Sequence, residues 1–225
     1  MNVFRYSRRI VGVLALALLP LAFGCTNPFQ PADPEPPSGD AVVEDFSTPA
    51  AVLETMRKGI ESRSTNGANA YLHAFTESFG SESLPYRSFY DDAVKSAWES
   101  ANQITAPEPW DLLLERNVHT RLSSIRPTYP YHFQWAPDQA SPADDDFNAA
   151  DTAQYHRKYT LLAAPPNGDP EIIAIGFADL SFQKERSGRW SVYRWHDRLD
   201  PAVGVNPALT TQRTFSYWRL ESLHK

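Results

Sequence analysis

The chain has 225 residues and a formal net charge of −6, with 27 acidic residues against 21 basic ones. An acidic chain repels the phosphate backbone of nucleic acids, so we expect no nucleic-acid partner. The sequence contains one cysteine, so no intramolecular disulfide can form, and a domain of this length must be stabilised by buried side chains.

Residues 1–24 have the pattern of a secretory signal. Three arginines and no acidic residue precede an apolar run over residues 10–24, which is shorter than the roughly 20 residues of a membrane span. Cys25 follows directly, where lipoprotein processing requires a thiol to accept the lipid. We therefore predict that Cys25 is lipidated. The alternative is an ordinary signal-peptidase cut after Gly24, which would leave a lone exported thiol.

Removal of this signal leaves 18 basic residues against 27 acidic ones, a formal charge of −9. We expect an exported protein that is held at the cell membrane by its lipid. Thr26, rather than an aspartate, follows the cysteine. In a Gram-negative cell this resembles outer-membrane sorting, so the protein would face the periplasm.

Residues 25–45 are predicted to form a tether between the anchor and one domain over residues 46–225. Five prolines favour extended backbone there: Pro28, Pro31, Pro34, Pro36 and Pro37. About 20 residues at about 3.1 Å each would reach about 60 Å. The segment either spaces the domain from the membrane or is plainly disordered, and both readings predict this composition.

Three helices are predicted at the start of the domain. Thr48 can cap the first helix and Pro49 fits its first turn, and apolar residues follow at helical spacing: Val52, Leu53, Met56 and Ile60. The second helix carries Tyr71, Leu72 and Phe75. The third covers residues 91–103, with Val94 and Trp98 facing inward.

Strands are predicted after the helices. Val118, Thr120 and Leu122 alternate with polar neighbours, so residues 111–126 are expected to form a strand, followed by a short strand over 129–135 and a loop over 137–153. Three further strands, over 154–164, 171–184 and 190–197, are separated by short turns and should pair as antiparallel neighbours. Gly176 is a candidate bulge, and residues 210–225 suit a short helix.

Three segments carry a family resemblance. They are Thr48-Pro49-x-x-Val52-Leu53, the run from Tyr71 and Leu72 through Phe75 to Phe79, and Gly-Arg-Trp-Ser-Val-Tyr-Arg-Trp-His-Asp at residues 188–197. Together they resemble the nuclear transport factor 2-like superfamily, the cystatin-like α+β cone, and within it bacterial lipoproteins without an assigned role. The resemblance covers most of residues 48–197.

The resemblance implies an α+β fold in which a strongly bent antiparallel sheet wraps N-terminal helices as a cone with a pocket beneath them. Members of the superfamily include ketosteroid isomerase, scytalone dehydratase, polyketide cyclases and non-catalytic binding modules. Its motifs are packing motifs, so they predict the fold and leave the chemistry open.

Asp179 is the best acid–base candidate. Strand alternation places it on one face with Ile173, Ile175, Phe177 and Ser181. If that face lined a pocket, desolvation would raise the pKa of Asp179 toward that of a useful base, and Tyr155 or Tyr159 could polarise a carbonyl beside it. The alternative is an ion pair between Asp179 and a basic residue on a neighbouring strand, such as Arg157 or Arg194.

Aromatic residues on the predicted strands have two interpretations. Phe177, Tyr193 and Trp195 could line an apolar ligand pocket, or they could fill the core between sheet and helices. Asp197 is expected on the face of Trp195 and Tyr193, where it would accept backbone hydrogen bonds. No histidine or cysteine pair has metal-ligand spacing and no glycine-rich phosphate loop is present, so we expect neither a metal nor a cofactor.

Three functions remain open at this stage. The first is a non-catalytic, membrane-anchored envelope lipoprotein that binds a small apolar ligand or a protein partner. The second is an enzyme of the isomerase, dehydratase or cyclase type with Asp179 as its base, which would need an unpaired carboxylate inside a pocket with a phenol nearby. The third is a scaffold that forms a homodimer through the outer face of its sheet.

Overall fold

The computed structural model describes residues 41–62, 64–77, 84–125, 130–137, 146–165, 167–200 and 214–224. The predicted signal, Cys25 and most of the predicted tether lie outside these residues, as do Phe79 and the acidic residues of the 137–153 loop before Asp146. Within the described residues, no helix is long and apolar enough to cross a membrane.

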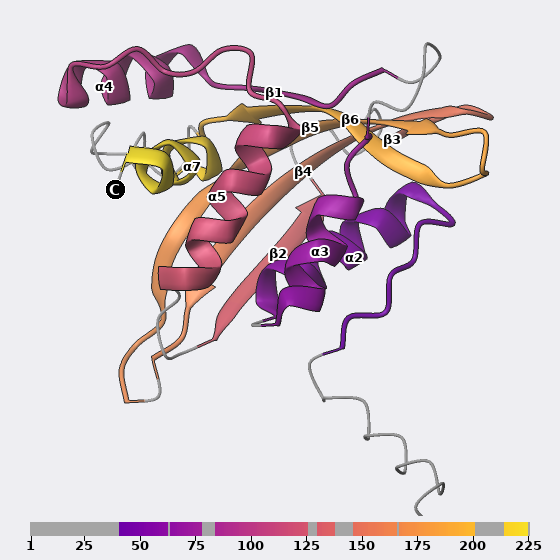
Figure 1. Cartoon of the computed structure of the whole chain (residues 1–225), viewed down its shortest axis with the longest axis horizontal. Coiled ribbons are helices and arrows are strands. Elements are labelled where there is room, and N and C mark those ends of the chain that lie inside the picture. Colours follow the sequence, from indigo (N-terminus) through magenta and orange to yellow (C-terminus); the bar gives the residue numbers. More distant parts are fainter. Residues whose placement is uncertain are drawn as a thin grey trace, which may run out of the picture. The chain divides into compact units, whose positions relative to one another are not determined.

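Five strands form the main path of one sheet, in the order β1 (Arg87–Phe89), β6 (Trp190–Arg198), β5 (Glu171–Lys184), β4 (Thr152–Ala163) and β2 (Tyr131–Pro137). A short strand, β3 (Asp146–Asn148), pairs with the start of β4. All pairs are antiparallel except β1 with β6. The long strands bend along their length (Figure 1). The predicted α+β class with a curved antiparallel sheet is therefore confirmed.

The N-terminal helices form where the sequence supplies caps. Thr48 Oγ1 accepts a hydrogen bond from the Ala51 amide at 3.1 Å and begins α2 (Pro49–Glu61). Ser64 caps α3 (Thr65–His73), and Asp91 caps α4 (Asp92–Asn102) in the same way. The three predicted N-terminal helices are thus confirmed. The C-terminal helix is α7 (Phe215–His224), also as predicted.

The core lies between one face of the sheet and α2, α3, α5 (Leu112–Ile125) and α7, which lie over that face (Figure 1). We call it the inner face. Its fully buried side chains include Phe133, Tyr159, Leu161, Ala174, Ala178, Phe182, Val192 and Trp195. The helices add Val52, Met56, Tyr71, Phe75, Val118, Phe215 and Leu220. Burial of this much apolar surface holds the domain together without a disulfide.

The predicted strand over residues 111–126 is wrong, because this segment is the helix α5. Glu115, Val118 and His119 are buried while Thr120 is exposed, which is a helical spacing of three and four residues. The prediction rested on Val118, Thr120 and Leu122 alone. Three alternating residues are too few to distinguish the two-residue period of a strand from the 3.6-residue period of a helix.

The predicted bulge at Gly176 is also wrong. The register between β4 and β5 shifts where Leu161 pairs with Ala174 and Leu162 with Ile172, so the extra residue is Ile173. Gly176 lies directly opposite Tyr159, and a Cβ there would be 2.5 Å from the Tyr159 hydroxyl. The glycine is needed because the tyrosine ring occupies the space above it.

A second register shift lies between β5 and β6. Ser181 pairs with Arg194 and Phe182 with Val192, so Tyr193 has no partner in the register. This shift moves Val192 to the inner face with Trp195 and leaves Tyr193 half-buried. The predicted common face for Tyr193, Trp195 and Asp197 is therefore wrong at Tyr193.

Candidate functional site

Asp179 lies on the sheet face opposite the core, which we call the outer face. Burial on β5 alternates, and Ala174, Ala178 and Leu180 are the buried residues while Asp179 is half-buried. Its carboxylate bonds to His156 Nδ1 at 2.6 Å and to Arg198 at 2.7 Å. Partial burial would raise the pKa of Asp179, but the hydrogen bonds from Arg198 and His156 outweigh it and hold the pKa below its usual value.

The desolvated base expected at Asp179 is therefore wrong, and the alternative of an ion pair with a neighbouring strand is confirmed with different partners. Arg198 and His156 make that contact, rather than Arg157 or Arg194. The Arg157 guanidinium instead lies 4.5 Å from the ring of Tyr155.

Tyr155 and Tyr159 are on the inner face, so the sheet separates them from Asp179. Tyr155 packs against Phe182. The Tyr159 hydroxyl donates to Asp197 Oδ1 at 2.6 Å and accepts from the Phe215 amide at 2.8 Å. Neither phenol can assist a reaction at Asp179.

Asp197 accepts a backbone hydrogen bond, as predicted, and the donor is the amide of Ser216 at 2.7 Å. Tyr159 and Asp197 together therefore bind the first amides of α7, which have no partner within that helix. Burial raises the pKa of Asp197, against the opposing hydrogen bonds from Tyr159 and Ser216, and burial likewise raises the pKa of Tyr159. The pair resembles an acid and a phenol of an active site, but both groups hold a helix terminus.

The predicted pocket residues do not meet. Phe177 lies on the outer face, with Lys158 Nζ at 5.8 Å and the Arg198 guanidinium carbon at 5.6 Å from its ring centre. Trp195 is fully buried and stacks on Phe215 at 5.1 Å. Since Tyr193 is at the register shift, the three do not line one pocket, and Trp195 fills the core.

A buried ion pair that sequence reasoning missed lies beneath α7. Arg219 contacts Glu115 of α5, with Nε–Oε2 at 3.0 Å and Nη2–Oε1 at 3.0 Å. Glu115 also accepts from Tyr71 at 2.6 Å and from Trp110 at 2.7 Å. Burial would lower the pKa of Arg219, but the charge of Glu115 raises it above its usual value, so the guanidinium stays charged.

The Arg219 guanidinium makes further hydrogen bonds besides those to Glu115. They reach the hydroxyl oxygens of Ser88 at 3.2 Å and of Tyr71 and Tyr86 at 3.3 Å. The buried charges of Arg219 and Glu115 are thus paired with each other. An arginine at position 219 carries no local sign of this role, since its partner is on another helix.

A shallow pocket of about 210 Å³ lies on the outer face. It is lined by Gln154, His156, Asp179, Leu180, Ser181, Arg194 and His196. The lining residues come from three adjacent strands in register. His156, Asp179 and His196 form one row across the sheet, and Gln154, Ser181 and Arg194 form the next. No group of three or more His, Cys, Asp or Glu side chains in the described ranges has the arrangement of a metal site.

No protein-family model matches the sequence, and no curated protein matches it. Solved structures do show similarity in fold. A protein of unknown function from Mycobacterium tuberculosis is 12% identical, with 78% of this chain and 86% of that chain covered and a TM-score of 0.48. A nuclear transport factor 2-like superfamily protein from Salmonella enterica serovar Typhimurium is 10% identical, with 69% and 90% covered and a TM-score of 0.41.

ActVI-ORFA from Streptomyces coelicolor is 8% identical, with 66% of this chain and 91% of that chain covered and a TM-score of 0.46. Of these three neighbours, the Salmonella protein is the one described as a member of the nuclear transport factor 2-like superfamily. Likeness at this level concerns the fold alone, and nothing about ligand or activity follows from it.

Proposed function

We propose that this chain is an exported, lipid-anchored, non-catalytic binding protein that contacts an anionic partner with the outer face of its sheet. Residues 1–24 supply the export signal, Cys25 the lipid attachment and residues 25–45 the tether. The sheet supplies the binding surface.

One contrast between the two faces supports this proposal most strongly. On the inner face, the charges of Arg219 and Glu115 are paired with each other and Asp197 is bonded to Tyr159. Phe215 and Trp195 fill the space between the Arg219–Glu115 pair and the Asp197–Tyr159 pair. A small apolar ligand inside the sheet would have to displace this packing, and a reaction would need groups that are already hydrogen-bonded.

The outer face has the opposite character. It carries the cationic side chains of Lys158, Arg194 and Arg198. Lys158 is paired with Asp200 and Arg198 with Asp179, which leaves the guanidinium of Arg194 as the open charge of the pocket. Phe177 lies between Lys158 and Arg198. An open arginine beside aromatic rings, on a chain of net charge −6, favours an anionic partner over another acidic surface of this chain.

The anchor is tested by acylation. Wild-type cells grown with a labelled fatty acid should yield labelled protein in the membrane fraction, and Cys25→Ser should abolish the label and release the protein. An unlabelled wild-type protein would contradict the anchor.

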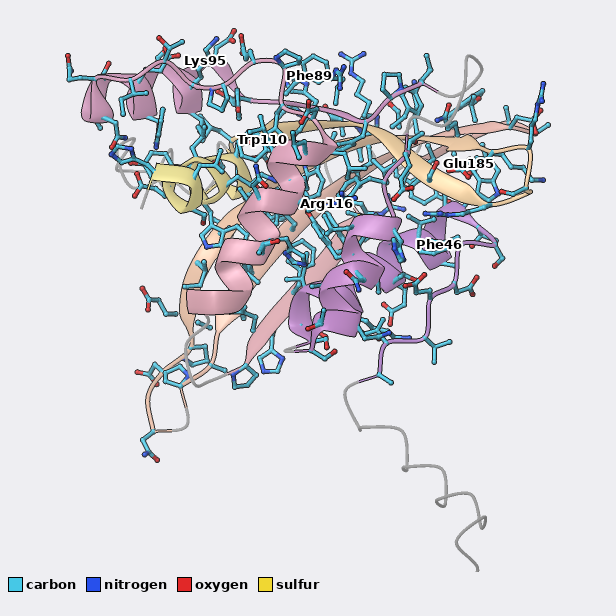
Figure 2. All side chains as sticks on the ribbon, viewed as in Figure 1. Phe46, Phe89, Lys95, Trp110, Arg116 and Glu185 are labelled. Atoms are coloured by element: carbon cyan, nitrogen blue, oxygen red, sulfur yellow. The ribbon has the colours of Figure 1, made fainter. Side chains whose placement is uncertain are left out.

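The binding surface is tested by native mass spectrometry of the full chain extracted in mild neutral detergent. We expect a non-covalently bound anionic species that survives Arg116→Gln and is lost in Arg194→Glu. Arg116 is an exposed arginine on α5, away from the outer face (Figure 2), and serves as the matched control. Equal retention by the two variants would contradict the outer-face proposal.

A further inference from the structure

The pocket on the outer face has the donors for one particular chemical group. We infer that the pocket lined by Arg194, His156 and His196 binds the phosphate group of an anionic ligand. This inference rests on the proposed function of the outer face. The ligand is either a soluble phosphate ester or the headgroup of an anionic phospholipid.

Arg194 is the primary donor. Its guanidinium carbon lies 4.7 Å from the ring centre of Phe89, which in turn makes an edge contact with His196 at 6.5 Å between ring centres. Within the described part of the chain, the guanidinium has no hydrogen bond or ion pair. Stacking on an aromatic ring holds the planar fork while its N–H groups stay open, which suits a phosphate.

Neutral donors stand beside the arginine. Gln154, Ser181 and Arg194 are direct cross-strand partners, so the amide, the hydroxyl and the guanidinium follow one line across β4, β5 and β6. Neither Gln154 nor Ser181 bonds to another described side chain. Donors on three strands that line one pocket can reach different oxygens of one oxyanion such as phosphate.

The acidic residue of the pocket does not oppose an anion, because its charge is matched. Asp179 is bonded to Arg198 and to His156 Nδ1, and His196 Nδ1 is 3.9 Å from its second oxygen. Asp179 therefore orients His156 through Nδ1, and no hydrogen bond to Nε2 is made by any residue that the structure describes.

The other charged groups of this face have their own contacts. Lys158 extends to Asp200 at 2.6 Å, and Arg87, which pairs with Arg194 in the register, donates to the carbonyl of Tyr86. The open charge at the pocket is thus Arg194, and the two histidines line the pocket beside it.

Two exposed phenylalanines stand at the ends of these rows. Phe89 on β1 is opposite His196 and is 42% exposed (Figure 2), and Phe147 on β3 is opposite Gln154 and is 58% exposed. Apolar rings on both sides of a cationic pocket suit a phosphate that carries an apolar substituent. A phospholipid headgroup has that chemistry and is present wherever a lipid anchor is inserted.

The first test titrates the full chain, in neutral detergent micelles, with inorganic phosphate and with sulfate, and follows the Arg194 and histidine side-chain resonances by NMR. We expect saturable binding that Arg194→Gln weakens about tenfold or more, while Arg116→Gln leaves it unchanged. Equal affinities for the two variants, or no saturation in the wild type, would overturn the pocket assignment.

The second test asks whether the histidines contribute, with sulfate as the probe at one fixed pH. His196→Ala should weaken sulfate binding, because it removes one of the side chains that line the pocket, whereas Arg116→Gln should leave the affinity unchanged. An unchanged affinity in His196→Ala would overturn the role of this histidine.

A third arm separates the two sources of phosphate. Micelles doped with phosphatidylglycerol should shift the Arg194 resonance and compete with sulfate if the headgroup binds, whereas a soluble ester is indicated if sulfate binds and the doped micelles do not compete. If neither binds while Arg194→Glu still removes the co-purifying species, the phosphate inference fails and the outer-face proposal stands.

Discussion

The guanidinium of Arg219 and the carboxylate of Glu115 form a two-point ion pair although 104 residues separate them in the chain. Their side chains are 1% and 2% exposed. Arg219 also lies over the rings of Trp195, at 4.2 Å, and Phe215, at 4.5 Å. One arginine therefore joins α7 to α5 and to the sheet, and closes the inner face with side chains of the protein itself.

Arg219→Met should strongly destabilise the domain. It removes the cation and leaves Glu115 buried without its charge partner, which costs about 3–5 kcal/mol in the free energy of unfolding. Urea denaturation measures the loss. Glu115→Gln added to Arg219→Met should recover part of it, because no buried charge remains, although the single amide oxygen can accept from only one of Tyr71 and Trp110, which bond to different oxygens of Glu115.

Arg116→Met is the matched control for this pair, because Arg116 is an exposed arginine next to Glu115 in the sequence of α5. It should change the unfolding free energy by about 0.5 kcal/mol or less. Similar losses for the two methionine variants would show that the ion pair is not a stabilising contact.

Gly176→Ala should destabilise the sheet by about 1–3 kcal/mol, the usual range for an overpacked core. The new Cβ would be 2.5 Å from the Tyr159 hydroxyl and 2.7 Å from the Arg198 carbonyl oxygen, so both strands must shift. The unfolding midpoint in urea is the measurement. Gly168→Ala is the control, since its nearest contact is 3.2 Å from a proline ring carbon in a turn; an equal effect there would argue against a special role for Gly176.

Strand alternation predicted which β5 residues share a face, and it could not predict which face is covered. From the sequence, the face of Ile173, Ile175 and Phe177 is a candidate pocket lining. The structure buries the face of Ala174, Gly176 and Ala178 instead. The reason is tertiary, because β4 brings Tyr159 to that side directly opposite Gly176, where a larger residue would have no room.

The sequence predicted those features that depend on a few neighbouring residues, such as helix caps and turns. Thr48 with Pro49 predicted the start of α2, and the turns around Gly168 and Gly188 predicted antiparallel neighbours. The contact between Arg219 and Glu115 has no such signal. It depends on α5 and α7 packing together, and the assignment of α5 as a strand concealed the helical position of Glu115.

Tyr159→Phe tests whether the Tyr159 and Asp197 pair holds the start of α7. Loss of the hydroxyl leaves the Phe215 amide without its acceptor and Asp197 Oδ1 without its donor, while the Ser216 amide still bonds to Oδ2; this should cost about 1–3 kcal/mol. Hydrogen exchange of the Phe215 and Ser216 amides should accelerate. Tyr217→Phe, on the same helix with a half-buried ring, should leave both amides protected; unchanged exchange in Tyr159→Phe would contradict the capping role.

Asp179→Asn tests the outer-face ion pair through acid stability. Folding lowers the pKa of Asp179. Its ion pairs therefore stabilise the folded protein at a pH above about 3.9, the pKa of an aspartate in the unfolded chain. This stabilisation disappears as the pH falls through the lower pKa that Asp179 has in the folded protein. The variant should be about 0.5–1 kcal/mol less stable from pH 5 to 8, and the gap should close below about pH 4. Asp169→Asn, at an exposed turn, is the control and should show no gap.

Asp197→Asn should have the opposite dependence on pH. Burial raises the pKa of Asp197, so the folded state binds a proton that the unfolded state releases above about pH 3.9. The free energy of unfolding of the wild type therefore falls as the pH rises from about 3.9 through the raised pKa that Asp197 has in the folded protein. At a pH above that pKa the loss of stability remains. An asparagine has no charge to bury, although its single oxygen can accept from only one of Tyr159 and Ser216, which donate to different oxygens of Asp197. The stability of Asp197→Asn relative to the wild type should thus increase with pH in urea titrations from pH 4 to 8. A relative stability that decreases over this range would show that folding favours the ionised form of Asp197.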